Sequence, residues 1–475
     1  MHLATRRRKT RLHTAAVVCL AFVSTASADD LDRAIEAEMA RQQIPGLSLA
    51  VVRKGEIVRL QAYGYGDLEW RAKATPDTRF EIASMSKMFT GAAVRILMDE
   101  GKLDPEALLT RHFDGLPDIW RTMKVRHLVT MSSGLPEDWG GDLIPYNSDV
   151  TTAYDDASMV KAFTTLKMDA PPGTEYHYSS PGYAMLGMLV ARISGGPLTE
   201  FLAERVFKPA SMDHSTFIDN WEIVPERAQD YRRAQGKVVK GWYLGQYLHA
   251  RPDVGILSTA GDIARWVIAL RAGRILKDPE RLWQGATAES GHALDYSYGW
   301  ITGAHLGHRT VGHGGRYRTG FRSALNLCPD DDLGVVVLAN SDYANVDRLA
   351  MLATREYLGD LPDLQVESAK PDPDAARTAS VIAALKALAA GRIDASSTNA
   401  DALDPITIGE ASGFLREVES YGFAGARRLS GQGLLVHGHK LVDYVTIKLQ
   451  MKADSRFLTV YRDDRGRIAY TELTE

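Results

Sequence analysis

Strand-like segments lie at both ends of the first 360 residues, with helical segments between them. Gly46 to Arg53 and Glu56 to Ala62 flank a Lys54-Gly55 turn, which predicts a hairpin. Strand-like runs return between Tyr298 and Asn340, after a mixed helical stretch at about residues 105 to 290. A sheet that joins sequence-distant segments and carries helices on its faces accommodates this order. We therefore predict an α+β fold, in which an antiparallel sheet flanked by helices has a helical region inserted between its halves.

The remainder of the chain indicates a second folding unit. A chain of 475 residues exceeds what one hydrophobic core usually organises. Residues 361–377 are rich in Pro, Asp and Ala without an apolar period, which is typical of a linker. Helical patterns at Ala379 to Ala390 and Gly409 to Tyr421 precede four strand-like runs. We predict a main domain over residues 29–360 and a small α+β accessory domain over residues 378–475.

The first 28 residues are typical of an export signal. Five basic residues between Arg6 and Arg11 precede an uncharged, mostly apolar run from Thr14 to Val23, and Ala26-Ser27-Ala28 offers small residues for cleavage. The apolar run is too short to span a bilayer comfortably. We predict cleavage before Asp29, no transmembrane anchor after processing, and a periplasmic or secreted protein. The consecutive arginines leave both the general and the twin-arginine export routes open.

Charge and motif content argue against several classes of function. Without the signal, 51 basic residues face 60 acidic ones, a formal charge of −9, which disfavours nucleic-acid binding. Cys328 is then the one remaining cysteine, and an apolar-rich run before it indicates a buried thiol. The histidines lack metal-ligand spacing, and Gly64 to Asp67 lacks the third glycine of a dinucleotide fingerprint. We expect neither a metal nor another cofactor.

Ser84 and Lys87 are the first candidates for chemistry. They stand three positions apart near the start of a helix predicted to run to about Glu100, so both side chains occupy one face. A serine hydroxyl becomes a nucleophile when a base takes its proton, and a lysine in a dry pocket has lowered basicity. The spacing alone is weak evidence, because Ser158 and Lys161 repeat it in what reads as a capped surface helix.

The residues around Ser84 make the signal specific. The segment Phe80 to Thr90 resembles the nucleophile segment of the serine β-lactamase and penicillin-binding-protein superfamily, and most of all class C β-lactamases, D-aminopeptidases and related carboxylesterases. The resemblance covers about residues 30 to 360. Four further segments match the family's motifs in the same order: Leu128 to Pro136, Pro172 to Tyr183, Leu257 to Asp262, and Gly312 to Gly315.

The resemblance implies roles for individual residues. Ser84 would be the acylated nucleophile, Lys87 its activating partner, and Tyr178 the phenol that relays a proton to the leaving group. The backbone N–H groups of Ser84 and Arg316 would bind the oxyanion. Taken without the resemblance, Tyr178 reads as an ordinary core aromatic residue.

The implied substrate-binding residues are Ser180, His313, Gly314, Gly315 and Arg316. His313 would face the cavity from a sheet strand, although by itself it reads as a structural histidine. The glycines beside it allow close approach of a ligand lying along that strand.

Two departures from the family pattern bear on the substrate. Ser180 stands where the family usually has asparagine, and its short hydroxymethyl group offers no amide donors to an acylamide side chain. His313 replaces lysine, which makes a cation for a substrate carboxylate conditional on pH. Both changes favour a peptidase or esterase over a dedicated β-lactamase, with a small molecule or peptide as substrate.

Two other functions stay open at this point. One is a catalytically weak protein that keeps the fold in order to bind or sense peptidoglycan-like peptides. The other places the function in the C-terminal domain, as a protein-interaction module. The sequence predicts no oligomeric state.

Overall fold

A computed structural model describes most of the chain. The described residues are 26–137, 156–219, 222–241, 251–289, 291, 293–305, 307–316, 320–358, 374–399, 415–428, 434–436, 439–451 and 455–474.

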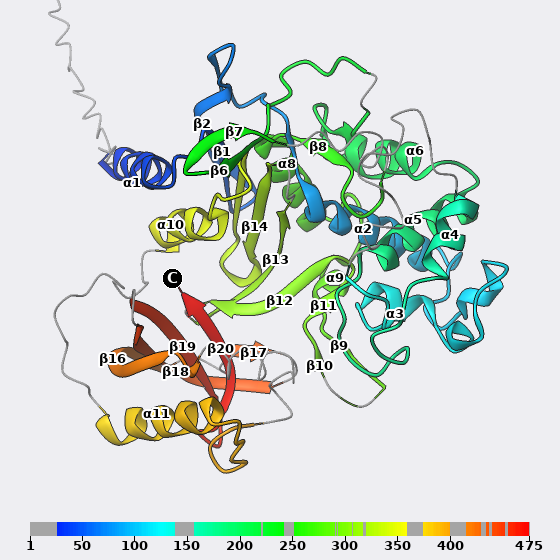
Figure 1. The fold of residues 1–475 in the computed structure, drawn as a ribbon. Coiled ribbons are helices and arrows are strands. Elements are labelled where there is room, and N and C mark those ends of the chain that lie inside the picture. The colour runs from blue at the N-terminus through cyan, green and yellow to red at the C-terminus, as the bar shows by residue number, and fades with distance from the viewer. Residues whose placement is uncertain are drawn as a thin grey trace, which may run out of the picture.

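The main domain is built on an antiparallel sheet of eight strands among the described residues, in the order β11-β12-β13-β14-β15-β1-β2-β3 (Figure 1). The N-terminal hairpin joins the later strands directly, because β1 pairs with β15 from Leu47 opposite Ala339 to Arg53 opposite Leu333. The predicted α+β fold with a sheet of sequence-distant segments is therefore confirmed. The strands are β1 (Gly46–Arg53), β2 (Glu56–Asp67), β3 (Ala72–Lys73), β11 (Tyr296–Ser297), β12 (Trp300–His305), β13 (His308–Arg316), β14 (Arg322–Cys328) and β15 (Leu333–Ala339).

Both faces of this sheet are apolar, so β1 is buried from Gly46 to Val52 instead of alternating with polar residues. Leu47, Leu49 and Val51 face α1 (Ala26–Gln42) and α10 (Val346–Leu358). Ala50 and Val52 belong to the larger core on the opposite face, against α8 (Ala260–Arg271). The sheet thus lies between two helical layers (Figure 1).

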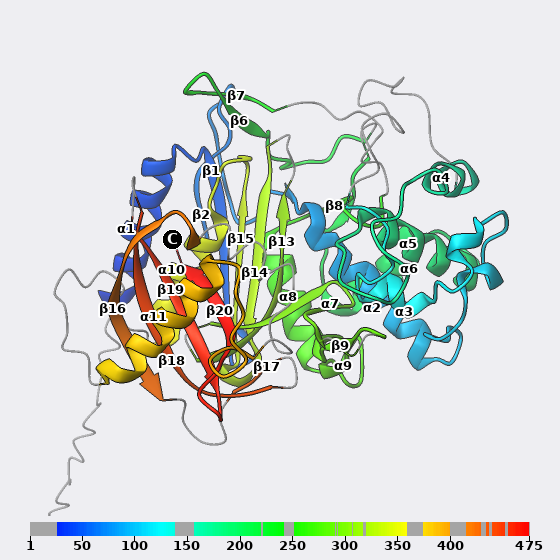
Figure 2. The ribbon, with the colours of Figure 1, turned by 60° about the horizontal axis from the view of Figure 1, so that its bottom comes forward.

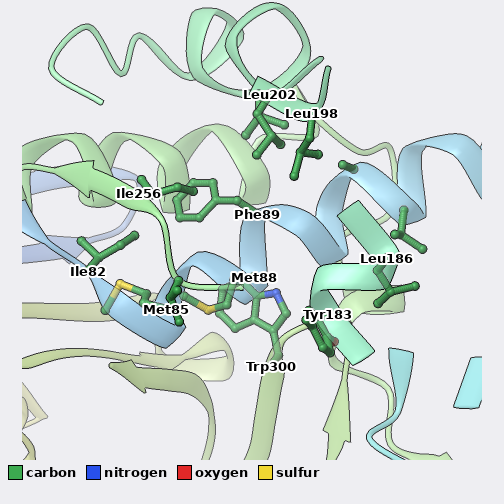
Figure 3. Packing of buried hydrophobic residues seen from close by; sticks show 14 of the residues in the cluster. Ile82, Met85, Met88, Phe89, Tyr183, Leu186, Leu198, Leu202, Ile256 and Trp300 are labelled. Atoms are coloured by element: carbon green, nitrogen blue, oxygen red, sulfur yellow. The ribbon is translucent and has the colours of Figure 1, made fainter. Parts of the chain in front are cut away.

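The larger core extends into the inserted helical region. Its central element is α2 (Ser86–Asp99), whose residues are buried almost all round. Phe89 of α2 stacks on Trp266 at 4.2 Å between ring centroids, and Figure 3 shows it close to Leu202 and Ile256. The other helices here are α3 (Val125–Val129), α4 (Asp156–Phe163), α5 (Ser180–Ser194), α6 (Leu198–Leu202), a π-helix (Ala203–Phe207), α7 (Lys208–Ala210) and α9 (Glu280–Trp283).

Short strands and turns complete the main domain. A small sheet has the order β4-β8-β5, and two hairpin pairs are β6 with β7 and β9 with β10. Their bounds are β4 (Phe80–Glu81), β5 (Thr216–Phe217), β6 (Tyr231–Ala234), β7 (Lys237–Lys240), β8 (Ile256–Ser258), β9 (Ala286–Thr287) and β10 (Ala293–Leu294), and single 3-10 turns span Ala83–Met85, Leu109–Arg111, Asp118–Trp120 and Pro329–Asp331.

The C-terminal part forms a second sheet in the order β16-β18-β19-β20, with β17 paired to β18. Helix α11 packs on one face (Figure 2), and Tyr444 and Tyr461 on the other face pack against Ala304 of β12. Gly307 N donates a hydrogen bond of 3.1 Å to Tyr461 Oη. The elements are α11 (Ala375–Ala389), β16 (Val418–Arg428), β17 (Leu434–Val436), β18 (His439–Met451), β19 (Ser455–Asp463) and β20 (Ile468–Thr474).

Two local predictions in the C-terminal part need correction. The end of the predicted helix over Gly409 to Tyr421 is strand, because residues from Val418 onward pair with β18. Helix α11 begins at Ala375, where the Asp374 side chain accepts the Arg377 N–H, so the last residues of the predicted linker 361–377 are helical. Residues 359–373 and 400–414 lie outside the described residues.

The predicted export signal lies almost wholly outside the described residues, which begin at Ala26 with the first turn of α1. Among the helices that are described, none has the length and apolar character needed to cross a membrane.

Candidate active site

The nucleophile candidate lies where a strand turns into a buried helix. Strand β4 pairs with β8, Ala83 takes a left-handed φ of 50°, and a 3-10 turn containing Ser84 leads into α2. Ser84 is half-buried, whereas Lys87, one turn later, is wholly buried. Lys87 Nζ lies 3.2 Å from Ser84 Oγ, so the two predicted partners are in contact.

Lys87 Nζ also has partners outside its own helix. Nζ donates to Ser180 Oγ at the start of α5 and to the backbone oxygen of Asp253, both at 3.2 Å. A buried amine must find acceptors for its N–H groups, and these two contacts together with Ser84 supply them from three segments of the chain. Ser180 therefore helps to hold Lys87, a contact that its sequence position alone did not indicate.

The Asp253 carbonyl is fixed by a buried ion pair that the sequence did not reveal. Arg251 donates to both carboxylate oxygens of Asp253, from Nε at 3.0 Å and Nη2 at 2.6 Å. Between them, Pro252 O accepts a hydrogen bond of 2.6 Å from Thr90 Oγ1, so this loop is tied to α2 twice. The contact atoms are backbone carbonyls, which leave no trace in a residue pattern. The one available signal was an Arg-x-Asp sequence in a loop.

Tyr178 completes the cluster. Its hydroxyl lies near enough to the Ser84 side chain to interact with it, and Lys87 Nζ lies 5.0 Å from the centroid of its ring. Burial raises the pKa of Tyr178 well above its ordinary value, so the side chain is a phenol at neutral pH. Ser179, the next residue, caps α5 by accepting the Gly182 N–H at 3.1 Å, and this cap sets the positions of Tyr178 and Ser180.

His313 lies beside Tyr178, with 6.1 Å between ring centroids, but both of its ring nitrogens are engaged within the protein. Its Nε2 is 2.9 Å from Tyr296 Oη, and its Nδ1 contacts the backbone oxygen of Gly314. Burial, and after it the charge of Lys87, lower the pKa of His313 to about 3. The imidazole is therefore neutral from pH 5 to 8, and the pH-dependent cation that the sequence suggested at this position does not form in that range.

On the β12 side, the end of β13 near Ser84 has no partner strand among the described residues. Strand β12 pairs with β13 only as far as Gly312, whereas β14 pairs with it to Arg316. A Cβ on Gly315 would lie 2.1 Å from the backbone oxygen of Ile82, so glycine is required for this approach. The approach brings the Arg316 backbone next to the Ser84 segment, as oxyanion binding by both N–H groups requires.

The Arg316 side chain has a different environment from its backbone. Gly314 and Arg316 alternate with His313 and Gly315, and Gly314 pairs with Ala324 in the core on the α10 side of the sheet. The exposed Arg316 side chain therefore leaves the sheet on the face away from His313.

The second Ser-x-x-Lys sequence, Ser158 to Lys161, lies on α4 and is not part of this cluster. Lys161 is exposed on α4, whereas the Ser158 side chain lies outside the described residues. Among the described residues there is no group of three or more His, Cys, Asp and Glu side chains that could hold a metal. Cys328 is buried and forms no disulfide with any described residue.

Comparison with known proteins agrees with this arrangement. The family model described as beta-lactamase matches residues 31–358, which is more than half of the chain. The chain belongs to the beta-lactamase family. Two curated members similar to it are Protein flp of Staphylococcus aureus strain MW2, 26% identical over 68% of this chain and 65% of the relative, and a D-aminopeptidase of Brucella canis, 29% identical over 69% and 62%. The chain thus spans less than two thirds of the length of either relative.

Two solved structures share the family fold. A penicillin-binding protein homologue from Pyrococcus abyssi, described as octameric, matches 94% of this chain and 98% of its own, with 20% identity and a TM-score of 0.61. A penicillin-binding protein from Bacillus halodurans matches 68% and 98%, with 23% identity and a TM-score of 0.58. The first match extends beyond the family domain into the C-terminal sheet.

Proposed function

We propose that the protein is a serine hydrolase that forms an acyl-enzyme on Ser84. The observation that carries the proposal is the position of Ser84 next to both Lys87 and Tyr178, beside the end of β13 that β12 does not pair. The family membership and the similarity to a D-aminopeptidase support the same class of reaction.

The reaction follows from the positions of these groups. Ser84 Oγ attacks the carbonyl carbon of the substrate while its proton passes to the Lys87 amine in its unprotonated form, 3.2 Å away. The oxyanion that results is stabilised by the N–H groups of Ser84 and Arg316. Tyr178, a phenol at neutral pH, gives its proton to the leaving nitrogen or oxygen as that bond breaks, and Lys87 restores it. Water then releases the acyl group from Ser84 by the reverse transfers.

We further propose that esters or peptides are better substrates than β-lactams. Ser180 is engaged with Lys87, which leaves its hydroxyl poorly placed to replace the amide donors of asparagine. Initial rates with nitrocefin, a p-nitrophenyl ester and a D-alanine-containing peptide test this proposal. We expect ester turnover above lactam turnover, and fast nitrocefin hydrolysis without esterase activity would contradict it.

Covalent labelling tests the acyl-enzyme itself. A fluorophosphonate probe or a fluorescent penicillin should label the wild-type protein, lose its adduct in Ser84→Ala, and retain it in Ser158→Ala. A wild-type protein inert to both probes and to the substrate panel would favour the alternative of a peptidoglycan-peptide binding protein.

Export is a separate proposal. The basic and apolar segments before Asp29 support a periplasmic or secreted location. N-terminal sequencing of the mature protein from a periplasmic fraction should begin at Asp29, and an intact Met1 start would contradict it.

A further inference from the structure

A cavity of about 660 Å³ lies in the inserted helical region, between α4, α5, α6 and β5 (Figure 1). Small-molecule sites in proteins typically measure about 300–1,000 Å³. The described residues that line this cavity include none of Ser84, Lys87, Tyr178 and His313. The cavity is therefore separate from the candidate active site, and the proposed reaction assigns it no role.

The inner wall of the cavity is apolar. Its buried side chains come from α4, α5, α6, the π-helix and the β5 segment, and all belong to the larger core of the main domain: Met159, Met188, Leu198, Phe207, Phe217 and Ile218. Two of them are methionines, whose flexible side chains adapt to different shapes. A wall of this kind binds the hydrocarbon part of a ligand, because the contact removes that part from water.

The π-helix forms one side of the cavity. Its first and last residues, Ala203 and Phe207, both line the cavity. A π-helical turn closes its hydrogen bond one residue later than an α-helical turn, is rare, and occurs frequently at functional sites. This irregular turn is an observation independent of the size of the cavity, and it points to the same place.

The charges around the cavity are predominantly negative. Arg251 is the one cation among the described lining residues, and its guanidinium is paired with the buried Asp253 carboxylate. Asp219 and Glu222 add two carboxylates, and Glu222 is exposed. Three carboxylates against one guanidinium give a formal charge of 1 − 3 = −2. This charge attracts a cation and repels an anion.

We propose that this cavity is a second binding site, which takes a small apolar amine with its hydrocarbon part against the apolar wall and its ammonium beside Asp219 and Glu222. A primary amine is protonated at neutral pH, as lysine is. Its N–H groups need acceptors, and carboxylate oxygens form the strongest hydrogen bonds with them. The binding goes beyond the proposed function and does not depend on it.

One loop separates the cavity from the candidate active site. Pro252 lines the cavity and packs so closely on α5 that a Cβ on Gly187 would lie 2.3 Å from its ring. The backbone oxygen of the next residue, Asp253, accepts from Lys87 Nζ. An amine that binds beside Pro252 favours the loop conformation in which Lys87 is held. We therefore expect the amine not to slow the reaction at the active site.

Three ligands with the same hydrocarbon part measure the charge preference. We compare 4-phenylbutylamine, 4-phenylbutan-1-ol and 4-phenylbutanoate by isothermal titration calorimetry of the full chain at pH 7. The amine should bind about tenfold more tightly than the alcohol, and the carboxylate more weakly than the alcohol. No binding of the amine, equal binding of amine and alcohol, or tightest binding of the carboxylate would each overturn the inference.

Matched variants locate the two parts of the ligand. Asp219→Asn combined with Glu222→Gln should lower the affinity for the amine to that for the alcohol. Glu204→Gln should change neither, because Glu204 is an exposed carboxylate on the π-helix and does not line the cavity. Ala203→Trp places a large ring at an exposed lining position, and should weaken amine and alcohol alike with little change in the thermal unfolding midpoint. Wild-type affinity for the amine in the double variant or in Ala203→Trp would contradict the proposed site.

Labelling of Ser84 shows whether the amine occupies the active site instead. The rate of fluorophosphonate labelling in saturating 4-phenylbutylamine should not fall below the rate without it. Labelling that slows as the amine saturates would place the amine in the active site and overturn the inference. A protein that the probe does not label would refute the proposed function, and the titrations of the wild type and the double variant would still decide the binding site.

Discussion

Gly315→Ala tests the geometry on which oxyanion binding depends. The new Cβ would lie 2.1 Å from Ile82 O, 2.3 Å from Ser323 Oγ and 3.1 Å from the Ala83 Cβ. Restoring ordinary contact with Ile82 O requires the end of β13 and the Ser84 segment to separate by roughly 1 Å, and a shift of that size typically costs about 100-fold in rate. Losing one oxyanion donor costs about 10²–10³ in kcat. We therefore expect Ser84 acylation to slow by about 100-fold, with about 1–3 kcal/mol of destabilisation from overpacking.

Gly314→Ala is the matched control. A Cβ there would meet Ser323 O at 3.4 Å, an ordinary contact, and both substitutions reduce the entropy of the unfolded chain alike. The assay is the rate of fluorophosphonate labelling, read beside the thermal unfolding midpoint of each variant. We expect Gly314→Ala to stay within about threefold of the wild-type rate. Equal rates for the two variants would show that close approach of β13 to Ser84 does not govern acylation.

Three further perturbations test separate parts of the site. Lys87→Met should slow labelling of Ser84 by about 10²–10⁴-fold, because it removes the proposed base, whereas Lys161→Met should label normally. Arg251→Met should destabilise the protein by about 3–5 kcal/mol in urea unfolding, because the buried Asp253 carboxylate loses its partner; an unfolding midpoint equal to that of the wild type would contradict this expectation. Burial, and then the charge of Glu81, raise the pKa of Asp230 to about 7. The folded state thus holds a proton that the unfolded chain releases near pH 4, and this contribution to stability is full below pH 4 and lost as the pH rises to 7. Asp230→Asn should accordingly stabilise the protein relative to the wild type above pH 7 and make no difference below pH 4, as urea midpoints across that range would show.

The strands of the main domain were predictable where their side chains carry the signal. Apolar runs located β1, β14 and β15, and Lys54-Gly55 forms the expected turn, with φ angles of 50° and 77°. In β13 the strand-like side-chain pattern covers only Arg309 to Gly312, whereas the strand continues to Arg316. Glycine has low strand propensity, so Gly314 and Gly315 carry no strand signal. Their extended form comes from pairing with β14, a tertiary contact.

Within the candidate site, residues that belong to a local motif were predictable, and residues that converge from elsewhere were not. Ser84, Lys87 and Tyr178 lie in two recognisable segment patterns, and the structure brings the three side chains together. Asp253 and Tyr296 each reach the site through one oxygen atom, which contacts Lys87 and His313 respectively. The segments around these two residues carry no recognisable motif. In the C-terminal part, Val418 to Tyr421 followed a helical pattern, but pairing with β18 decided their conformation.

The strained backbone before Ser84 explains why contacts distant in sequence matter to the site. Ala83 holds a left-handed φ of 50°, which costs on the order of 1–3 kcal/mol for a residue with a side chain. The surrounding bonds enforce it: Ile82 O accepts from Ser323 Oγ at 2.7 Å, and Ile82 N donates to Ile256 O at 3.0 Å. The N–H of Ile256 in turn donates to Ser86 Oγ at 3.1 Å. Strands β14 and β8 thus hold the residues on either side of Ser84, so the orientation of its hydroxyl and N–H is set by the folded core before any substrate arrives.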